Sequence, residues 1–118
     1  MTTLEGADPE SLAQRWFEVD PDADTRAETE QLIEAGGTEL IARFGSHLEF
    51  GTAGLRGRLG SGPNRMNRVI VRLVASAIAE DVADESDPHV VVGFDARHGS
   101  SVFATDTARV LLTRGVRT

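Results

Sequence analysis

The pattern of apolar and polar positions in the first 47 residues predicts three short helices joined by turns, over 9–18, 25–35 and 38–44. Asp8 is a suitable N-cap for the first helix, because its carboxylate can accept a hydrogen bond from a free backbone N–H of the first turn. The residues expected to face inward are Leu12, Trp16, Phe17, Leu40, Ile41 and Phe44. We expect these helices to form an extension over a larger structure rather than a core of their own.

The pattern of the remaining residues predicts an alternation of helix and strand. A helix is expected from about 67 to 83, a β-branched strand at 89–94, a helix over 100–114 and the opening of another strand at 116–118. The apolar stripe expected on the first of these helices is Val69, Ile70, Leu73, Val74, Ala77, Ile78 and Val82. A run such as 89–94 is typical of a strand buried on both faces. This order predicts an α/β fold with a parallel strand pair and a right-handed crossover.

Length and charge limit the classes of function. A chain of 118 residues with 40% apolar residues can bury one small core, and a net charge of −7 argues against general nucleic-acid binding. The absence of cysteine excludes disulfides, zinc–thiolate sites and a cysteine nucleophile. The N-terminus lacks the order of a signal peptide, and no apolar run reaches membrane-spanning length. We therefore expect a cytoplasmic protein with no membrane partner.

One loop reverses the acidic character of the chain. Residues 51–68 contain glycine at positions 51, 54, 57, 60 and 62 and arginine at 56, 58, 65 and 68, with no acidic residue. A Walker loop is excluded because the chain has no lysine, and the third glycine of a dinucleotide fingerprint is missing. An anion-binding loop remains, since glycines expose backbone N–H groups and arginine suits phosphate. The alternative is a surface hairpin whose arginines pair with the acidic N-terminal half.

Two segments of the sequence resemble a known family. Phe50–Gly57 reads F-G-T-A-G-L-R-G, and Val92–Ser100 reads V-G-F-D-A-R-H-G-S after the expected strand. Both resemble the first domain of the α-D-phosphohexomutases, the phosphoglucomutase and phosphomannomutase superfamily. With alanine at position 53, the first motif resembles that of the phosphoglucomutase/phosphopentomutase-type subgroup. The N-terminal stretch of the sequence resembles that subgroup as well. The resemblance implies an N-terminal helical extension over 1–47 and an incomplete α/β domain I over 48–118.

The resemblance also implies roles for individual residues. Arg56 would bind a phosphate of the substrate or of the bisphosphate intermediate, with Thr52 beside it. Arg97 would support the catalytic loop, with help from His98 and Ser100. These roles suit phosphoryl transfer, which depends mostly on positioning and on stabilising dispersed negative charge.

A purely structural interpretation of the second segment remains open. Asp95 and Arg97 could be a pair at a strand end that orients its own loop, and His98 could be structural. His47 and His89 have no partners at metal-ligand spacing, so we expect no metal site in this chain.

The sequence also departs from the family pattern. It contains neither a T-A-S-H-N-P-type loop, which would carry the phosphoserine, nor a D-x-D-G-D-R-type loop, which would bind Mg²⁺. We therefore expect the N-terminal part of a phosphohexomutase, truncated before the phosphoserine loop and inactive alone. The complete isomerase would move a phosphoryl group between positions 1 and 6 of a hexose phosphate, or 1 and 5 of a pentose phosphate. It would use Mg²⁺ and hexose 1,6-bisphosphate.

The expected partners follow from the same resemblance: hexose or pentose phosphates and the missing C-terminal domains. Two other functions remain open. One is a module that binds sugar phosphates without turnover, and the other is an acidic interaction module formed by the charged N-terminal helices. The identity of the sugar is left open among glucose, mannose and a pentose.

Overall fold

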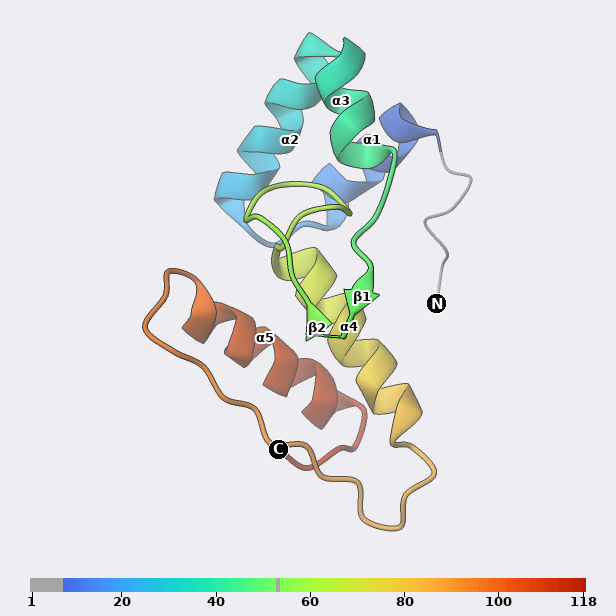
Figure 1. Cartoon of the computed structure of the whole chain (residues 1–118), viewed down its shortest axis with the longest axis vertical. Helices are drawn as coiled ribbons and strands as arrows, with labels where there is room; N and C mark the ends of the chain where they lie inside the picture. The colour runs from blue at the N-terminus through green and yellow to red at the C-terminus, as the bar shows by residue number, and fades with distance from the viewer. Residues whose placement is uncertain (1–7, 53) are drawn as a thin grey trace. The chain divides into compact units, whose positions relative to one another are not determined.

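The N-terminal half of the chain forms three helices that pack on one another (Figure 1). The protein is described by a computed structural model at residues 8–52 and 54–118. Its helices there are α1 (Pro9–Val19), α2 (Ala23–Ala35) and α3 (Gly37–Phe44). The three predicted helices are confirmed, each beginning within two residues of the expected position.

Two aspartates set the start and the end of α1. Asp8 is the N-cap, as predicted, and its carboxylate accepts the N–H of Ser11 at 3.1 Å. Asp20 is buried just after α1, where it accepts the N–H of Asp22 at 3.0 Å and the hydroxyl of Thr25 at 2.5 Å. These hydrogen bonds compensate for the burial of the Asp20 carboxylate and fix the turn into α2.

The contact between α1 and α3 is built on two aromatic rings. Trp16 and Phe44 are both buried and meet edge to face, with their ring centroids 5.8 Å apart. Leu12 and Leu40 are buried as predicted, whereas the prediction for Ile41 was wrong because its side chain is 59% exposed. In a helix of eight residues, Leu40 and Phe44 lie one turn apart and define the inward face, and the next position turns away from it.

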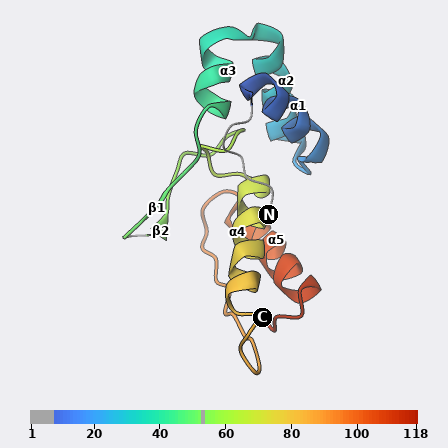
Figure 2. The same ribbon diagram turned by 90° about the vertical axis from the view of Figure 1, so that its right-hand side faces the viewer.

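A short antiparallel hairpin follows the helices. β1 (Phe50–Gly51) pairs with β2 (Gly54–Leu55), with Phe50 opposite Leu55 and Gly51 opposite Gly54. Figure 2 shows this hairpin extending away from α1–α3. Contacts group the helices, the hairpin and the following loop into one compact unit, Met1–Val69. The predicted division into 1–47 and 48–118 stays a prediction.

The second compact unit is Ile70–Thr118, and side chains connect its two helices. These are α4 (Arg68–Asp81) and α5 (Ser100–Thr113). Arg72 forms an ion pair with the buried carboxylate of Asp106 at 3.1 Å, and Arg114 donates to the Ser76 hydroxyl at 2.7 Å. Ala79, Leu111 and Val116 form an apolar cluster near the C-terminal ends of both helices.

The buried face of α4 differs in part from the predicted stripe. Ile70 is buried as expected, but the other buried positions are Val71, Ala75 and Ala79, while Ala77 and Ile78 are exposed. The remaining members of the predicted stripe, Val69, Leu73, Val74 and Val82, are half-buried, so the packed side overlaps the predicted stripe without matching it. Periodicity alone did not separate these two faces.

The strand predicted at 89–94 is wrong for this structure. Only His89 forms a bridge, a parallel one with Arg117, in which Val90 N–H donates to the Arg117 carbonyl at 2.8 Å. Val91 is 88% exposed and Phe94 67% exposed rather than buried. A parallel strand needs neighbours along its whole length, and the described residues supply one short partner. The predicted parallel pairing is present as this single bridge.

The fold class is therefore α/β, with five helices and a small two-stranded sheet among residues 8–52 and 54–118. In that part of the chain, every helix is too short or too polar to cross a membrane.

Candidate functional site

The first candidate site lies on the β1–β2 hairpin. Thr52 is exposed in the turn, and Arg56 is exposed directly after β2. Within the described residues the side chains of Arg56 and Arg58 have no hydrogen-bond or ion-pair partner, so both guanidinium groups are available to bind an anion. An exposed guanidinium is suited to bind phosphate through several hydrogen bonds, and an exposed hydroxyl can donate one more.

Both ends of the hairpin are hydrogen-bonded to the loop that follows it. The N–H of Leu48, before β1, donates to the Pro63 carbonyl at 3.0 Å. After β2, the Arg58 carbonyl accepts the N–H of Met66 at 2.7 Å, and Gly60 N–H donates to the Met66 carbonyl at 3.2 Å. The position of the hairpin therefore depends on the loop at 60–67.

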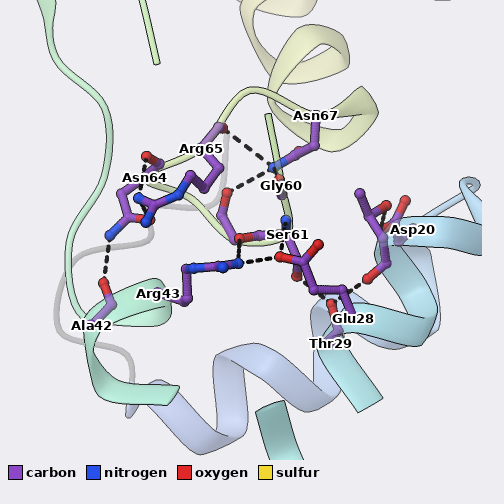
Figure 3. Close-up of polar contacts among 12 residues, drawn as sticks. Asp20, Glu28, Thr29, Ala42, Arg43, Gly60, Ser61, Asn64, Arg65 and Asn67 are labelled. Atoms are coloured by element: carbon purple, nitrogen blue, oxygen red, sulfur yellow. Dashed lines mark hydrogen bonds and ion pairs between the residues drawn. The ribbon is translucent and has the colours of Figure 1, made fainter. Parts of the chain in front are cut away.

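That loop is in turn bound to the helices by a polar network, shown in Figure 3. The N–H of Ser61 donates to Glu28 at 3.1 Å, its hydroxyl meets that of Thr29, and its carbonyl accepts from Arg43 at 3.4 Å. Arg43 also forms an ion pair with Glu28. Ser61 and Thr29 are fully buried. Sequence patterns did not indicate this network, because its partners are far apart along the chain.

Asn67 holds the loop from the other side. α4 begins directly after Asn67, as predicted. The buried amide nitrogen of Asn67 also donates to the Gly60 and Gly62 carbonyls, both at 2.8 Å, and to that of Arg65 at 3.3 Å. A buried amide that donates to several carbonyls of one turn fixes that turn, because the buried N–H groups would be left unsatisfied if the turn moved away.

Gly62 is required by packing rather than by a ligand. Its φ is +106°, and an added Cβ would lie 2.6 Å from the Arg43 carbonyl oxygen. Gly60 has a φ of +151°, and its Cβ position lies 3.2 Å from the Glu28 carboxylate. Gly60 and Gly62 thus allow the loop to pack closely against α2 and α3. The hypothesis that glycine N–H groups bind an anion therefore applies only to the glycines of the hairpin.

Two arginines of the loop lack, among the described residues, the ion pairs that the surface-hairpin interpretation requires. Arg56 and Arg58 have no acidic partner there. The guanidinium of Arg65 donates to its neighbour Asn64, at 3.1 Å to the side-chain oxygen and 3.3 Å to the carbonyl. The surface-hairpin interpretation anticipated the hairpin shape, but within the described residues no acidic side chain neutralises Arg56 or Arg58.

The second candidate segment is the loop before α5. Asp95 and Arg97 form an exposed ion pair, with contacts at 2.9 Å to Nε and 2.7 Å to Nη2, and the Arg97 N–H also donates to Asp95 at 3.0 Å. The Ser100 hydroxyl accepts the N–H of Asp95 at 3.0 Å. His98 is exposed and has no hydrogen-bond partner among residues 8–52 and 54–118.

Arg97 changes the titration of its partner. Its side-chain hydrogen bond, and then its backbone N–H, hold the pKa of Asp95 at about 2, below the ordinary 3.8. Asp95 in return raises the pKa of Arg97. Because the folded-state pKa of Asp95 is lowered, the pair stabilises the loop above pH 3.8 and stops doing so as pH falls through about 2.

We expect Arg97→Ala to return the pKa of Asp95 toward 3.8. The carbon chemical shift of the Asp95 carboxyl, followed by NMR between pH 1.5 and 6, measures this directly (the range brackets both values). Ser100→Ala is the matched comparison and should raise the pKa less, because Ser100 is the smaller of the two influences. An unchanged midpoint in Arg97→Ala would contradict the assignment.

The described residues do not fit a magnesium site. They contain no group of three or more His, Cys, Asp or Glu side chains able to hold a metal ion. His47 Nδ1 lies 3.0 Å from the Leu48 carbonyl, and His89 is at the parallel bridge with Arg117. No catalytic step can be assigned here to a metal held by these residues.

Comparison with protein families decides the classification. The family described as phosphoglucomutase/phosphomannomutase, alpha/beta/alpha domain I, matches residues 47–118. The chain belongs to this family. Both candidate segments lie within the match, which begins one residue before Leu48 and so excludes the three N-terminal helices.

Individual mutases support the same family. A probable phosphoribomutase of Schizosaccharomyces pombe is 37% identical over 92% of this chain and 19% of its own length. A phosphoglucomutase of Staphylococcus haemolyticus is 41% identical over 63% of the chain and 14% of its own length. A phosphopentomutase of Mus musculus is 34% identical over 86% of the chain and 18% of its own length. The chain thus spans a fifth or less of these relatives. No solved structure gives a significant match.

Proposed function

We propose that this chain supplies the N-terminal part of a phosphomutase acting on hexose or pentose phosphates, and that its hairpin binds a phosphate group of the sugar. The observation that carries the proposal is Arg56, an exposed guanidinium without an acidic partner in the described residues, on a hairpin inside the family match. Thr52 in the turn of the same hairpin adds a hydroxyl. Phosphoryl transfer is catalysed mainly by such positioned charges.

The second segment has a supporting role in this proposal. Arg97 is held by two side-chain contacts and one backbone contact to Asp95, so it orients the loop that precedes α5. His98 lies in the same loop, and Ser100 is the first residue of α5. Arg97, His98 and Ser100 are proposed to shape the catalytic loop rather than to react.

The remaining chemistry belongs to residues outside this chain. We propose that 48–118 is a partial domain I, that 1–47 is a helical extension, and that further domains supply the phosphoserine and the ligands of Mg²⁺. The relatives are about five or more times longer than the matched part, which supports the proposal of further domains. When bound, Mg²⁺ would stabilise the negative charge on the transferring phosphoryl group. Hexose 1,6-bisphosphate would be the intermediate that binds at Arg56.

The chain alone is expected to show no mutase turnover. Glucose 1-phosphate, glucose 1,6-bisphosphate and Mg²⁺ would be incubated with the purified chain, and glucose 6-phosphate would be measured with a coupled dehydrogenase. The expected result is no product above a blank, because the sequence contains neither the serine loop nor the metal loop. Turnover by protein free of host mutase would contradict the proposed division. Binding of sugar phosphate without turnover is expected both of an enzyme fragment and of a binding module, so this assay does not distinguish the two functions.

A chimera separates those two functions. Residues 8–118 of this chain would replace the matching part of the S. pombe probable phosphoribomutase, whose alignment covers 92% of this chain. The proposal predicts mutase activity in the chimera, measured on ribose 1-phosphate and glucose 1-phosphate. A folded chimera that binds sugar phosphate but does not turn over would favour the binding module instead.

A further inference from the structure

Two of the N-terminal helices, α2 and α3, contact the loop that follows the hairpin through Glu28, Thr29 and Arg43. Resting on the proposed function, we propose that Glu28 and Thr29 of α2, acting through Ser61, are positioning residues for the phosphate-binding hairpin. The contacts of Glu28, Thr29 and Arg43 with Ser61 are called the Ser61 anchor below. All of these residues and the hairpin belong to the unit Met1–Val69.

The Ser61 anchor uses every polar group of its central residue. The Ser61 N–H donates to Glu28, its carbonyl accepts from Arg43, and its hydroxyl meets that of Thr29. Thr29 also donates to the Thr25 carbonyl at 2.8 Å, so its hydroxyl joins the helix to the loop. Since Ser61 and Thr29 are fully buried, a lost partner would leave a polar group with no water to replace it.

The anchor is connected to the hairpin by backbone hydrogen bonds. Pro63, two residues after Ser61, accepts the N–H of Leu48, which leads into β1. The N–H of Gly60, the residue before Ser61, donates a hydrogen bond to the Met66 carbonyl. The N–H of Met66 in turn donates to the carbonyl of Arg58, which follows β2. Both ends of the hairpin are thus hydrogen-bonded within a few residues of Ser61.

The hairpin needs this external support. It contains two residue pairs, and an isolated two-stranded ribbon is marginally stable in water. Displacement of a binding group by about 1 Å can cost on the order of a hundredfold in rate. An arginine on such a short hairpin therefore binds well only if both ends are held, and the anchor meets that requirement.

The test compares threonine variants of the full chain. Thr29→Val removes the hydroxyl while keeping the shape, and Thr29→Ser restores a hydroxyl. Thr105→Val is the matched control, because Thr105 makes the same bond to the carbonyl four residues earlier, at 3.0 Å, but is exposed and meets no loop. Amide hydrogen exchange at Leu48, Gly60 and Met66 is measured by NMR, together with the affinity for glucose 1,6-bisphosphate.

The expected result is faster exchange at the three amides in Thr29→Val, by roughly threefold to tenfold, and a similar loss of bisphosphate affinity. Thr29→Ser and Thr105→Val should match the parent chain. Emission from Trp16, the single tryptophan, reports whether the helices remain packed. If the Trp16 emission shifts in Thr29→Val, the helices have repacked, and Ser61→Ala then tests the same contact from the loop side.

Each other outcome is decisive. Unchanged exchange in both Thr29→Val and Ser61→Ala would overturn the anchor, even if the parent chain binds bisphosphate. Faster exchange with unchanged affinity would make the anchor purely structural and overturn the positioning role. Failure of the parent chain to bind bisphosphate would instead reject the proposed function, and exchange at Leu48, Gly60 and Met66 would then decide the anchor alone.

Discussion

Replacing Arg56 with alanine is expected to lower kcat/KM of the active chimera about ten- to a hundredfold. The Arg56 guanidinium is exposed and has no acidic partner within the described residues, so all of its hydrogen-bonding capacity is available to phosphate. A charge-assisted hydrogen bond contributes about 1.5–3 kcal/mol, and each ~1.4 kcal/mol is a factor of ten. Initial rates over a range of ribose 1-phosphate concentrations measure the loss.

Two neighbouring arginines provide the matched controls. Arg58 is equally exposed and has the same charge, and Arg65 already donates to Asn64. Arg58→Ala and Arg65→Ala should each cost less than about 1 kcal/mol, or roughly fivefold. Equal losses at all three positions would show that the loop attracts phosphate through its total charge. The specific role of Arg56 would then be wrong.

The segment at 90–94 is expected to make the 118-residue chain associate. Beyond Val90, whose N–H is bonded to Arg117, none of the next four residues has a backbone hydrogen-bond partner in the part of the chain that the structure describes. Val91 and Phe94 are largely exposed beside this open backbone. An extended, apolar segment with open N–H and C=O groups pairs readily with another chain. Analytical ultracentrifugation from 1 to 200 μM, the range of weak association on the order of micromolar Kd, should reveal dimers and larger species.

A charge at the open segment should suppress that association. Burial of one valine contributes about 1.5–3 kcal/mol, so Val91→Lys should raise the dissociation constant by on the order of tenfold to a hundredfold. Val19→Lys is the control, because Val19 is also exposed but lies at the end of α1. A strictly monomeric parent chain with a sharp two-state thermal transition would contradict this account. It would show that residues 1–118 form a complete core without a partner.

The N-terminal helices could be predicted because their signals are local. Asp8 caps α1 and Gly36 ends α2, and both effects depend on residues within one helical turn. Ile41 was placed inward because it is apolar, yet a two-turn helix has room for only one buried pair on that face. Helix boundaries were therefore more predictable than helix faces.

Two other features could not be predicted, for opposite reasons. The segment at 89–94 has the composition of a central strand, but strand formation requires partners that the sequence of the segment does not specify. The Ser61 anchor does have its partners, yet Thr29 lies 32 positions away from Ser61 and Glu28 lies 33 away. Neither a motif nor a periodicity connects residues at such separations. The family motifs led to the prediction for Arg56 without any of this geometry, and the role of Arg56 stays a prediction.

The most direct test of the central claim is an NMR titration of the full chain with glucose 1,6-bisphosphate. Backbone amides and arginine Nε groups would be followed on the same sample, with sulfate at matched ionic strength as the control. The account predicts saturable shifts concentrated at Thr52 and at the Nε of Arg56, with Arg15 on the exposed side of α1 unaffected. Shifts spread over all arginines and reproduced by sulfate, or no shift at the hairpin, would contradict the proposal that the hairpin is a phosphate-binding element.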